Sequence, residues 1–290
     1  SRWAHAIPPR DGGTLDPFHH RVQSARMKIN YLRWVSGLAL ALAGMGSFTG
    51  CTTVPETGRH QFNFMSAGQE MQLGLSEFDK MKKEVPVSKD AAANALLQRV
   101  GRRIAAVAPL EGAQWEFVVF ESKEANAFCL PGGKVGVYTG ILPITKDEDG
   151  LATVIGHEVA HAVARHGGER ISVAMGLQTL GVVVDAATAS TKYHSAYVAG
   201  YGLGSQLGAA LPHSRMQEAE ADHLGLLYMA RAGYNPEAAV GFWQRFAEFN
   251  RKQGGNMPWF LRTHPLDETR IRRLQELMPE AKAQFRPAAR

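Results

Sequence analysis

Apolar positions along the chain recur at two spacings, three to four residues in most segments and two in a few. The helical spacing predicts helices over residues 66–83, 90–107, 146–165, 214–232, 236–252 and from about 265 onward. Residues 114–122, "QWEFVVFES", are aromatic and β-branched, which is typical of a strand. Two extended runs joined by Pro131-Gly132-Gly133 follow over 126–142. The pattern predicts an α+β domain, mostly helical with a small β-sheet.

The helix over 146–165 has clear end signals. Thr145 with Glu148 three positions later resembles a capping box. Arg165 and His166 place basic side chains at the far end, just before Gly167. We therefore expect one continuous helix between these signals.

Residues 172–212 carry only two formal charges, Asp185 and Lys192, and many Gly, Ala, Val and Tyr residues. Gln178 and Asp185 are expected to interrupt any run long enough to span a membrane. Buried core helices and a mobile cover over a cleft both fit this composition. The chain shows no internal repeat and no sign of a second domain.

The start of the chain predicts an export signal. From Met27 it reads "MKINYLRWVSGLALALAGMGSFTGC", with a basic start, an apolar stretch and small residues before Cys51. The apolar stretch is shorter than the ~20 residues of a membrane-spanning helix. The ending resembles a bacterial lipobox, so we predict a lipidated Cys51, a lipoprotein signal peptide at 27–50 and an extension at 1–26 that is absent from the mature protein. A cleaved secretory signal with an incidental cysteine is the alternative.

Charge and cysteine content exclude two classes of protein. Residues 1–50 hold six basic and two acidic residues, which accounts for four of the five net positive charges. The rest of the chain has no basic stripe, so binding to nucleic acid is excluded. Once Cys51 is lipidated, Cys129 remains alone, and no intrachain disulfide forms.

The segment "TVIGHEVAHAVARH" carries the candidate chemistry. His157 and His161 are four residues apart, so they lie about 40° apart around a helix and point the same way. Glu158 flanks that face at about 100°. Two imidazoles on zinc, with a carboxylate near enough to take a proton from water, match H-E-x-x-H chemistry. A chance match on an ordinary helix is the alternative, and a third ligand would exclude it.

A second helix, "SRMQEAEADHLGL", supplies that ligand. Glu218 and Asp222 share a helical face with Ala221 and Gly225, whose small side chains permit close approach of another helix. Asp222 is placed to accept a hydrogen bond from a ligating histidine. Glu220 is rotated about 200° from Glu218 and should face elsewhere. Further possible ligands, each of which fits a surface or capping position better, are His166, His194 and His213.

These motifs together resemble the gluzincin peptidases of metallopeptidase family forty-eight. The resemblance rests on H-E-V-A-H, then S-R-x-x-E-x-E-A-D, then T-H-P, and extends from about Thr57 to Leu277. It implies a zincin-like fold with one Zn²⁺ per chain, bound by His157, His161 and Glu218. It also implies Glu158 as the general base, and Asp222 and Arg215 as residues that support the ligands. The substrate would pair with the "NAFCLPGG" strand, through Asn126, Ala127, Phe128, Gly132 and Gly133.

The predicted organisation follows from these segments. Residues 51–65, polar with Pro and Gly, are expected to be a tether, 66–282 the zinc metallopeptidase domain and 283–290 a tail. We predict a zinc endopeptidase held by lipid on the periplasmic side of an outer membrane, since Thr52 rather than aspartate follows the cysteine. Misfolded or misassembled envelope proteins, bound as extended chains, are the expected substrates. A metal-bound chaperone or assembly factor with suppressed peptidase activity is the rival hypothesis.

His264, in "RTHPLDETR", has three possible roles. The sequence supplies no other evident donor for the oxyanion that forms on an attacked carbonyl, and a histidine held by an X-Pro junction could fill that role. In periplasmic members of the family the matching histidine can instead reach the zinc as a fourth ligand. Pro265 and Asp267 also fit the start of a helix, which would make His264 a capping residue. We place His264 at the metal site, with donor and fourth ligand both open.

Overall fold

The structure, a computed structural model, describes residues 51–252, 258–266 and 268–287. These belong to the second of the two units into which the chain divides, Gly50–Arg290. The predicted extension (1–26), the predicted signal peptide (27–50) and the last residues of the predicted tail lie outside the described residues.

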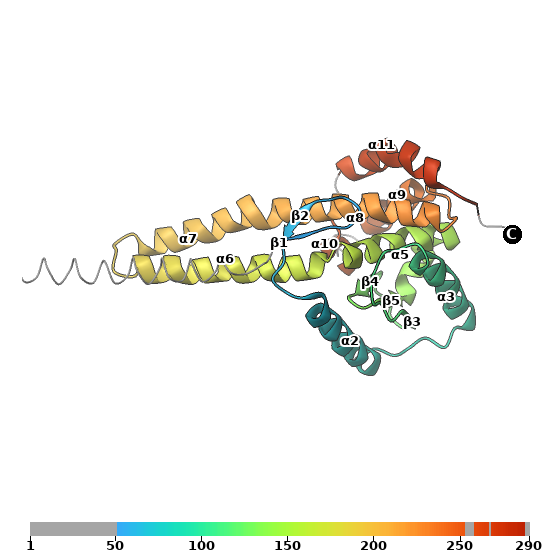
Figure 1. The fold of residues 1–290 in the computed structure, drawn as a ribbon, viewed down its shortest axis with the longest axis horizontal. Coiled ribbons are helices and arrows are strands. Elements are labelled where there is room, and N and C mark those ends of the chain that lie inside the picture. The colour runs from blue at the N-terminus through green and yellow to red at the C-terminus, as the bar shows by residue number, and fades with distance from the viewer. Residues whose placement is uncertain (1–50, 253–257, 267, 288–290) are drawn as a thin grey trace, which may run out of the picture. The chain divides into compact units, whose positions relative to one another are not determined.

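The described elements confirm an α+β fold that is mostly helical (Figure 1). In chain order they are β1 (Cys51–Thr53), β2 (His60–Phe62), α2 (Ala67–Glu84), α3 (Ala91–Ala105), β3 (Glu116–Phe120), β4 (Ala127–Leu130), β5 (Lys134–Tyr138), the 3₁₀ turn η1 (Thr139–Ile141), α4 (Leu142–Thr145), α5 (Glu148–Val163), α6 (His166–Thr188), α7 (His194–Ser205), the π-helical turn η2 (Gln206–Ala210), α8 (Leu211–Arg231), α9 (Ala238–Lys252), α10 (Trp259–Thr263) and α11 (Glu268–Gln284).

Side chains at the N-termini fix where the first helices begin. Ser66 and Gln69 form a capping box at α2, and the Asp90 carboxylate accepts from two backbone amides at α3. At α5 the cap is Asp147, which accepts from the Gly150 amide at 2.9 Å. The capping box predicted at Thr145 is wrong, because the Thr145 hydroxyl donates to the carbonyl of Leu142 and ends α4.

The larger sheet has the strand order β3-β5-β4, with β3 parallel and β4 antiparallel to the central β5. Gly132 and Gly133 turn the chain between β4 and β5 with φ near +85° and +80°, a backbone region that glycine tolerates. Within the described residues, β4 pairs only with β5, so its other edge is available for pairing.

Helix α5 is the centre of the fold. It contacts α3, α8, α9 and β4, and every residue from Gly150 to Val163 is buried. Its closest approach is to α8, where a Cβ on Gly225 would lie 2.7 Å from the backbone nitrogen of His157. The small residues predicted to permit this approach therefore lie where the two helices touch.

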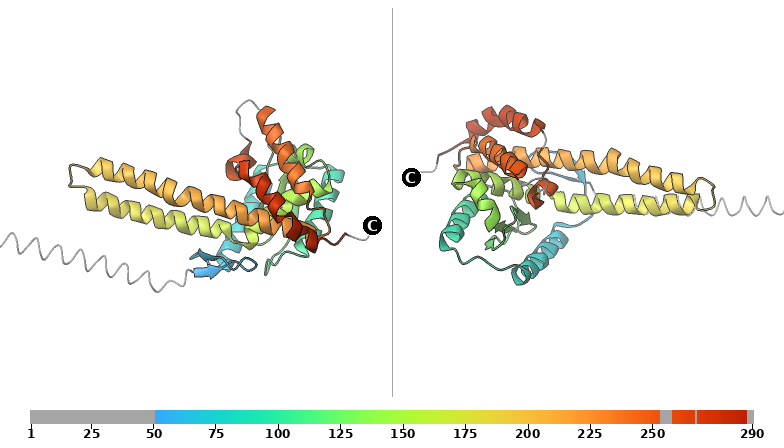
Figure 2. Two further views of the ribbon diagram at one scale, coloured as in Figure 1. Left: turned by 90° about the horizontal axis from the view of Figure 1, so that it is seen from above. Right: turned by 180° about the vertical axis from the view of Figure 1, so that it is seen from behind.

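Helices α6 and α7 run side by side away from the domain, as all three views show (Figures 1 and 2). We call residues 171–211 the hairpin, and the adjoining residues 165–170 and 214–220 of the chain its base. Its tip joins the two helices near Lys192, and α7 continues through η2 into α8. The hairpin is mostly exposed, so the prediction of buried core helices is wrong, and only its base lies near the cleft described below.

The predicted tether over 51–65 is a folded segment instead. Strands β1 and β2 pair antiparallel, and Val54 between them is fully buried. Arg59 forms ion pairs with Glu169 of α6 and Glu220 of α8, at 2.8 Å each. The segment is thereby fastened to the base of the hairpin through contacts with residues more than 100 positions away, which no local pattern shows.

Candidate metal centre

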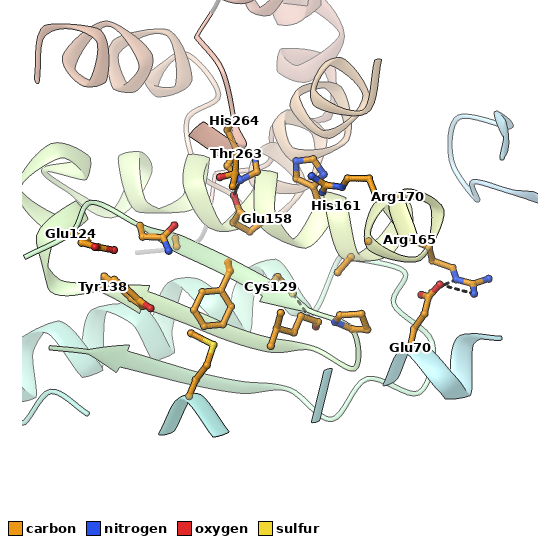
Figure 3. A pocket seen from close by; sticks show the side chains of 18 residues that line it. Glu70, Glu124, Cys129, Tyr138, Glu158, His161, Arg165, Arg170, Thr263 and His264 are labelled. Carbon is orange, nitrogen blue, oxygen red and sulfur yellow. Dashed lines mark hydrogen bonds and ion pairs between the residues drawn. The ribbon is translucent and has the colours of Figure 1, made fainter. Parts of the chain in front are cut away.

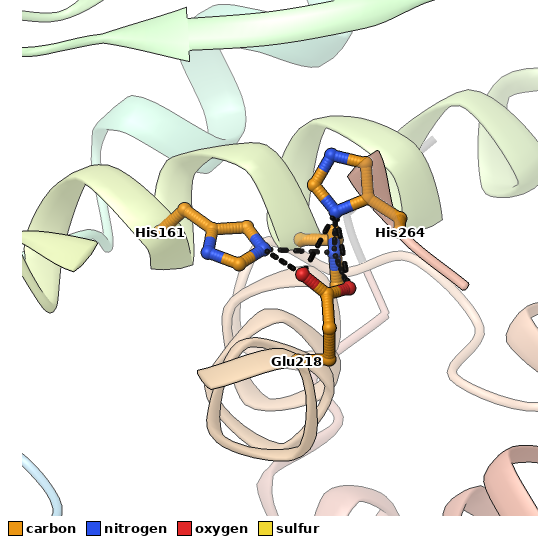
Figure 4. A group of neighbouring side chains, drawn as sticks. His161, Glu218 and His264 are labelled. Carbon is orange, nitrogen blue, oxygen red and sulfur yellow. Dashed lines mark hydrogen bonds and ion pairs between the residues drawn. The ribbon is translucent and has the colours of Figure 1, made fainter. Parts of the chain in front are cut away.

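Four side chains from three separate segments converge where α5 and α8 meet (Figure 4). His157 and His161 come from α5, Glu218 from α8, and His264 from the residue after α10. His161 Nε2 lies 3.1 Å from His157 Nε2 and 3.3 Å from Glu218 Oε1. His264 Nδ1 lies 3.2 Å from His157 Nε2 and 3.0 Å from Glu218 Oε2.

This group fits a tetrahedral metal ion. All four residues are buried, and one ligand atom from each lies within 4.8 Å of the others. Tetrahedral zinc with bonds of about 2.0–2.1 Å separates its ligand atoms by roughly 3.3 Å, which is close to the distances found here. Three imidazole nitrogens and one carboxylate oxygen are donors that zinc accepts.

The local charges favour a cation. Burial alone would raise the pKa of Glu218, but His161, His157 and His264 lower it well below its usual range. Burial alone would lower the pKa of His157, but its bonds to Asp222 and Glu218 prevail and raise this pKa to about 9. Two ionised carboxylates therefore favour positive charge where the ligand atoms meet.

Asp222 and Arg270 orient the first ligand. Asp222 Oδ1 lies 3.0 Å from His157 Nδ1, as its place on the face of Glu218 predicted, and this bond directs His157 Nε2 at the cluster. Arg270 of α11 donates to the same carboxylate at 2.7 Å and stacks 3.5 Å from the centre of the Trp243 ring. Arg270 was missed from the sequence, because only the docking of α11 brings it here.

Arg215, predicted to support the ligands, does not hold this position. Its side chain is exposed and lines a small cavity beside Glu218 and Asp222. Arg270 supplies the buried guanidinium instead, with 2% of its surface exposed.

His161 has its own partner on the other side. His161 Nδ1 lies 2.7 Å from His166 Nδ1, and His166 Nε2 lies 2.9 Å from Glu220 Oε2. Glu220 does face away from the metal cluster, as predicted, but it supports His161 through His166. His166 is fully buried, so its interpretation as a surface or capping residue is wrong. His194 lies at the tip of the hairpin, and the side chain of His213 falls outside what the structure describes.

Glu158 and His264 face each other across the cluster. Glu158 Oε1 is 3.3 Å from His264 Nε2, but it is buried without a well-formed hydrogen bond. Burial raises the pKa of Glu158, an effect that the neighbouring His264 opposes. A carboxylate with a free oxygen beside a metal-binding group is placed to accept a proton from water. His264 lies before the start of α11 at Glu268, so the structure does not make it that helix's cap.

A cleft of about 490 Å³ opens onto this group (Figure 3). Asn126, Ala127 and Phe128 line it from the β4 side, opposite Glu158, His161 and His264. Gly132 and Gly133, predicted to touch substrate, are not among the lining residues. They lie in the turn after β4, where their carbonyls accept from the amides of Gln114 and Glu116.

The fold and this site define a metallopeptidase of the H-E-x-x-H class. Residues 91–278 match the model of peptidase family M48, which covers more than half of the chain. The chain belongs to peptidase family M48, and its relatives support metalloendopeptidase activity.

Several relatives carry the name of mitochondrial metalloendopeptidase OMA1. The chain is 34% identical to that of Schizosaccharomyces pombe, over 86% of this chain and 73% of the relative. It is 39% identical to that of Saccharomyces cerevisiae, over 59% of this chain and 49% of the relative. The β-barrel assembly-enhancing protease of Escherichia coli is 27% identical, over 76% of this chain and 46% of that protein. The chain thus spans about half the length of two of these relatives and nearly three quarters of the first.

These relatives overturn the predicted location. The bacterial relative is less similar than the mitochondrial ones, and neither a periplasmic location nor a lipid anchor at Cys51 finds support among them. The prediction of a lipid-anchored protein at an outer membrane is therefore wrong. It rested on the signal-like pattern of residues 27–51 and on Thr52, and such a local pattern is weaker evidence than similarity across most of the chain.

Proposed function

We propose that this protein is a zinc-dependent endopeptidase that cleaves extended or unfolded segments of other proteins. The observation that carries the proposal is a buried cluster of three histidines and a glutamate, with the Glu158 carboxylate beside it, at the floor of a cleft. Zinc is the proposed metal because the donors are imidazole and carboxylate at tetrahedral spacing, as in catalytic zinc sites.

The residues of this site have separate roles in hydrolysis. When bound, zinc would acidify a water and polarise the peptide carbonyl. Glu158, whose Oε1 is free of a well-formed hydrogen bond, would take the proton of the attacking water and pass it to the leaving amine. Asp222 and His166 would hold His157 and His161 in one orientation, so that the metal geometry is maintained through the reaction.

The free edge of β4 supports a preference for extended substrates. A peptide added alongside β4 would form backbone hydrogen bonds, which select conformation more than side-chain identity. Cys129 of β4 lines the same cleft as Glu158 and His264, so a peptide on this edge would pass over the metal group. The names of the OMA1 relatives favour a mitochondrial location for this chemistry.

A second candidate, a latent protease that acts as a metal-bound chaperone or assembly factor, has one observation in its favour. His264 approaches the cluster as closely as the three predicted ligands do. A catalytic zinc needs an open coordination position, and a fourth protein ligand would fill it. In this state the enzyme would be inactive until His264 moved away.

The decisive experiment measures zinc content and degradation of an unfolded protein such as reduced, alkylated albumin. Glu158→Gln should keep zinc and thermal stability but lose activity by roughly 10²- to 10⁴-fold, the usual contribution of general acid–base catalysis. Glu248→Gln, an exposed glutamate of α9, is the matched control and should behave as wild type. Absence of zinc in the wild-type protein, or full activity in Glu158→Gln, would refute the peptidase proposal.

His264→Ala in the same assay separates the two candidates. If His264 donates to the oxyanion, its loss should lower activity by roughly 10²- to 10³-fold with zinc retained. If His264 blocks the metal, its loss should raise activity above the wild-type level. Wild-type activity with lower stability would assign His264 a structural role only.

A further inference from the structure

The hairpin over residues 171–211 lies outside the core of the domain. It projects from the domain in every view and takes no part in the metal site (Figures 1 and 2). We propose that this hairpin is embedded in the hydrocarbon core of a lipid bilayer, with its polar tip at the far headgroup region.

The first reason is the exposure of apolar side chains. Water-soluble surfaces rarely gather large apolar residues in one place. Leu180, Val182 and Leu203 have 53%, 64% and 60% of their surface exposed. Other large apolar residues of the hairpin that are also exposed are Ile171, Met175, Val183, Tyr193, Tyr197, Val198, Leu207 and Leu211. Such a surface is unfavourable in water along both helices.

The second reason is the length and hydropathy of α6. Its mean hydropathy over 18 residues is 1.5, and only 6% of that window is buried, so it is not a core helix of the domain. The part of α6 within the hairpin, residues 171–188, spans about 27 Å at 1.5 Å per residue, close to a hydrocarbon core of ~30 Å. We expected Gln178 and Asp185 to interrupt any run long enough to span a membrane. That expectation is wrong, because α6 is long and apolar enough by length and composition.

The third reason is where the charges lie. Asp185, Lys192 and His194 are all near the tip, and Asp185 pairs with His194 at 3.4 Å. Tyr193 and Tyr197 flank them, and tyrosine is enriched at membrane interfaces. At the base, the exposed side chains of Arg170 and Arg215 would face the near headgroups, where basic residues are favoured. Charged residues at both ends of an apolar stretch match the two surfaces of a bilayer.

Several hydroxyl groups inside the hairpin are also satisfied internally. The hydroxyls of Thr179, Thr188 and Ser205 donate to backbone carbonyls of their own helices. The Tyr201 hydroxyl crosses to the carbonyl of Leu177 in α6, and its ring lies over Gly181. Small residues and internal hydrogen bonds are how helices associate where no water is present.

Insertion would place the catalytic cleft at the membrane surface. Gly167 and Arg170, in the first turn of α6, line the cleft whose floor is the metal group. Segments of other proteins that leave the bilayer would then reach β4 directly. This consequence rests on the proposed peptidase function, whereas the insertion itself does not.

A fluorophore that reports water or lipid tests the insertion directly. In the full chain with Cys51→Ser and Cys129→Ser, a nitrobenzoxadiazole label is attached at Leu180→Cys and the protein is reconstituted into phosphatidylcholine vesicles. Its emission should shift to the blue and be quenched by brominated acyl chains. The matched control carries the label at Leu73→Cys of α2, 44% exposed, and should report water. Because the probe is local, membrane binding by residues outside the hairpin does not mimic the result.

Adding Val182→Glu to the Leu180→Cys protein should reduce the inserted fraction by roughly 10-fold or more, because a charge within the hydrocarbon core is costly. A probe at 180 that still reports water in vesicle-bound protein would overturn the proposal. The proposal would also be overturned if the probe were shielded in the absence of vesicles and this shielding increased with protein concentration. In that case a second copy of the chain, and not lipid, would cover the hairpin. Neither readout uses catalysis, so failure here leaves the peptidase proposal untouched.

Discussion

Helices α5 and α6 follow each other in the chain, and both are rich in apolar residues, but their surroundings are opposite. Every residue of α5 from Gly150 onward is buried by protein on all sides, and 6% of the apolar window of α6 is buried. The two helices are separated only by Ala164 and Arg165, the latter in a left-handed conformation. An apolar sequence therefore predicts that a helix is unfavourable in water. It does not show whether protein or another apolar medium surrounds that helix.

Helix α8 contacts both the buried helix α5 and the start of the exposed helix α6. Glu218 faces α5 and joins the metal group, whereas Glu220 faces the base of the hairpin, through His166 and Arg59. The metal site thus lies at the junction between a buried helix and an exposed one. Each of the following predictions changes matched residues on the two sides of that junction.

The largest expected effect comes from one substitution placed in each helix. Val159→Glu puts a carboxylate at a fully buried position in α5, and should destabilise the fold by roughly 4 kcal/mol or more. Val182→Glu, 64% exposed in α6, should change the free energy of unfolding by about 0.5 kcal/mol or less. Thermal unfolding by circular dichroism in buffer without detergent or lipid measures both. Equal losses would mean that the domain covers α6 after all.

The second comparison concerns the two glutamates of α8. Glu218→Ala removes a ligand and should lose most of the zinc. Glu220→Ala removes an indirect support of His161 and an ion pair with Arg59 but no ligand, and should lower metal affinity by roughly 10- to 100-fold at most. Zinc per chain after dialysis against a graded series of chelator concentrations distinguishes them. A larger loss from Glu220→Ala than from Glu218→Ala would remove Glu218 from the ligand set.

The smallest expected effect uses two glycines. Gly225→Ala places a Cβ 2.7 Å from the His157 backbone, and should cost about 1–3 kcal/mol by forcing α8 away from α5. Gly200→Ala in α7 meets nothing within 4 Å, and should stabilise the helix by up to about 1 kcal/mol. Chemical denaturation gives both values. The same sign of change in both variants would contradict the close contact between α5 and α8.

The sequence by itself determined the elements whose cause is local. Helical spacing predicted α2 and α3 to within one or two residues, because the apolar face of a helix repeats every three to four positions along the chain. The same periodicity placed His157 and His161 on one face of their helix. It also placed Glu218 and Asp222 on one face of theirs. Since metal ligands on helices must share a face, spacing along the chain was enough to nominate them.

Tertiary structure decided what depends on distant packing. Arg270 rather than Arg215 reaches Asp222, because α11 docks against α8 and α9 from almost 50 residues away. His166 is buried because Glu220 and the segment of Arg59 close over it. The hairpin is exposed because its apolar surface has no partner within the described part of the domain. Local patterns fix which way a side chain points along its own element, whereas the neighbour it meets depends on how separate elements pack.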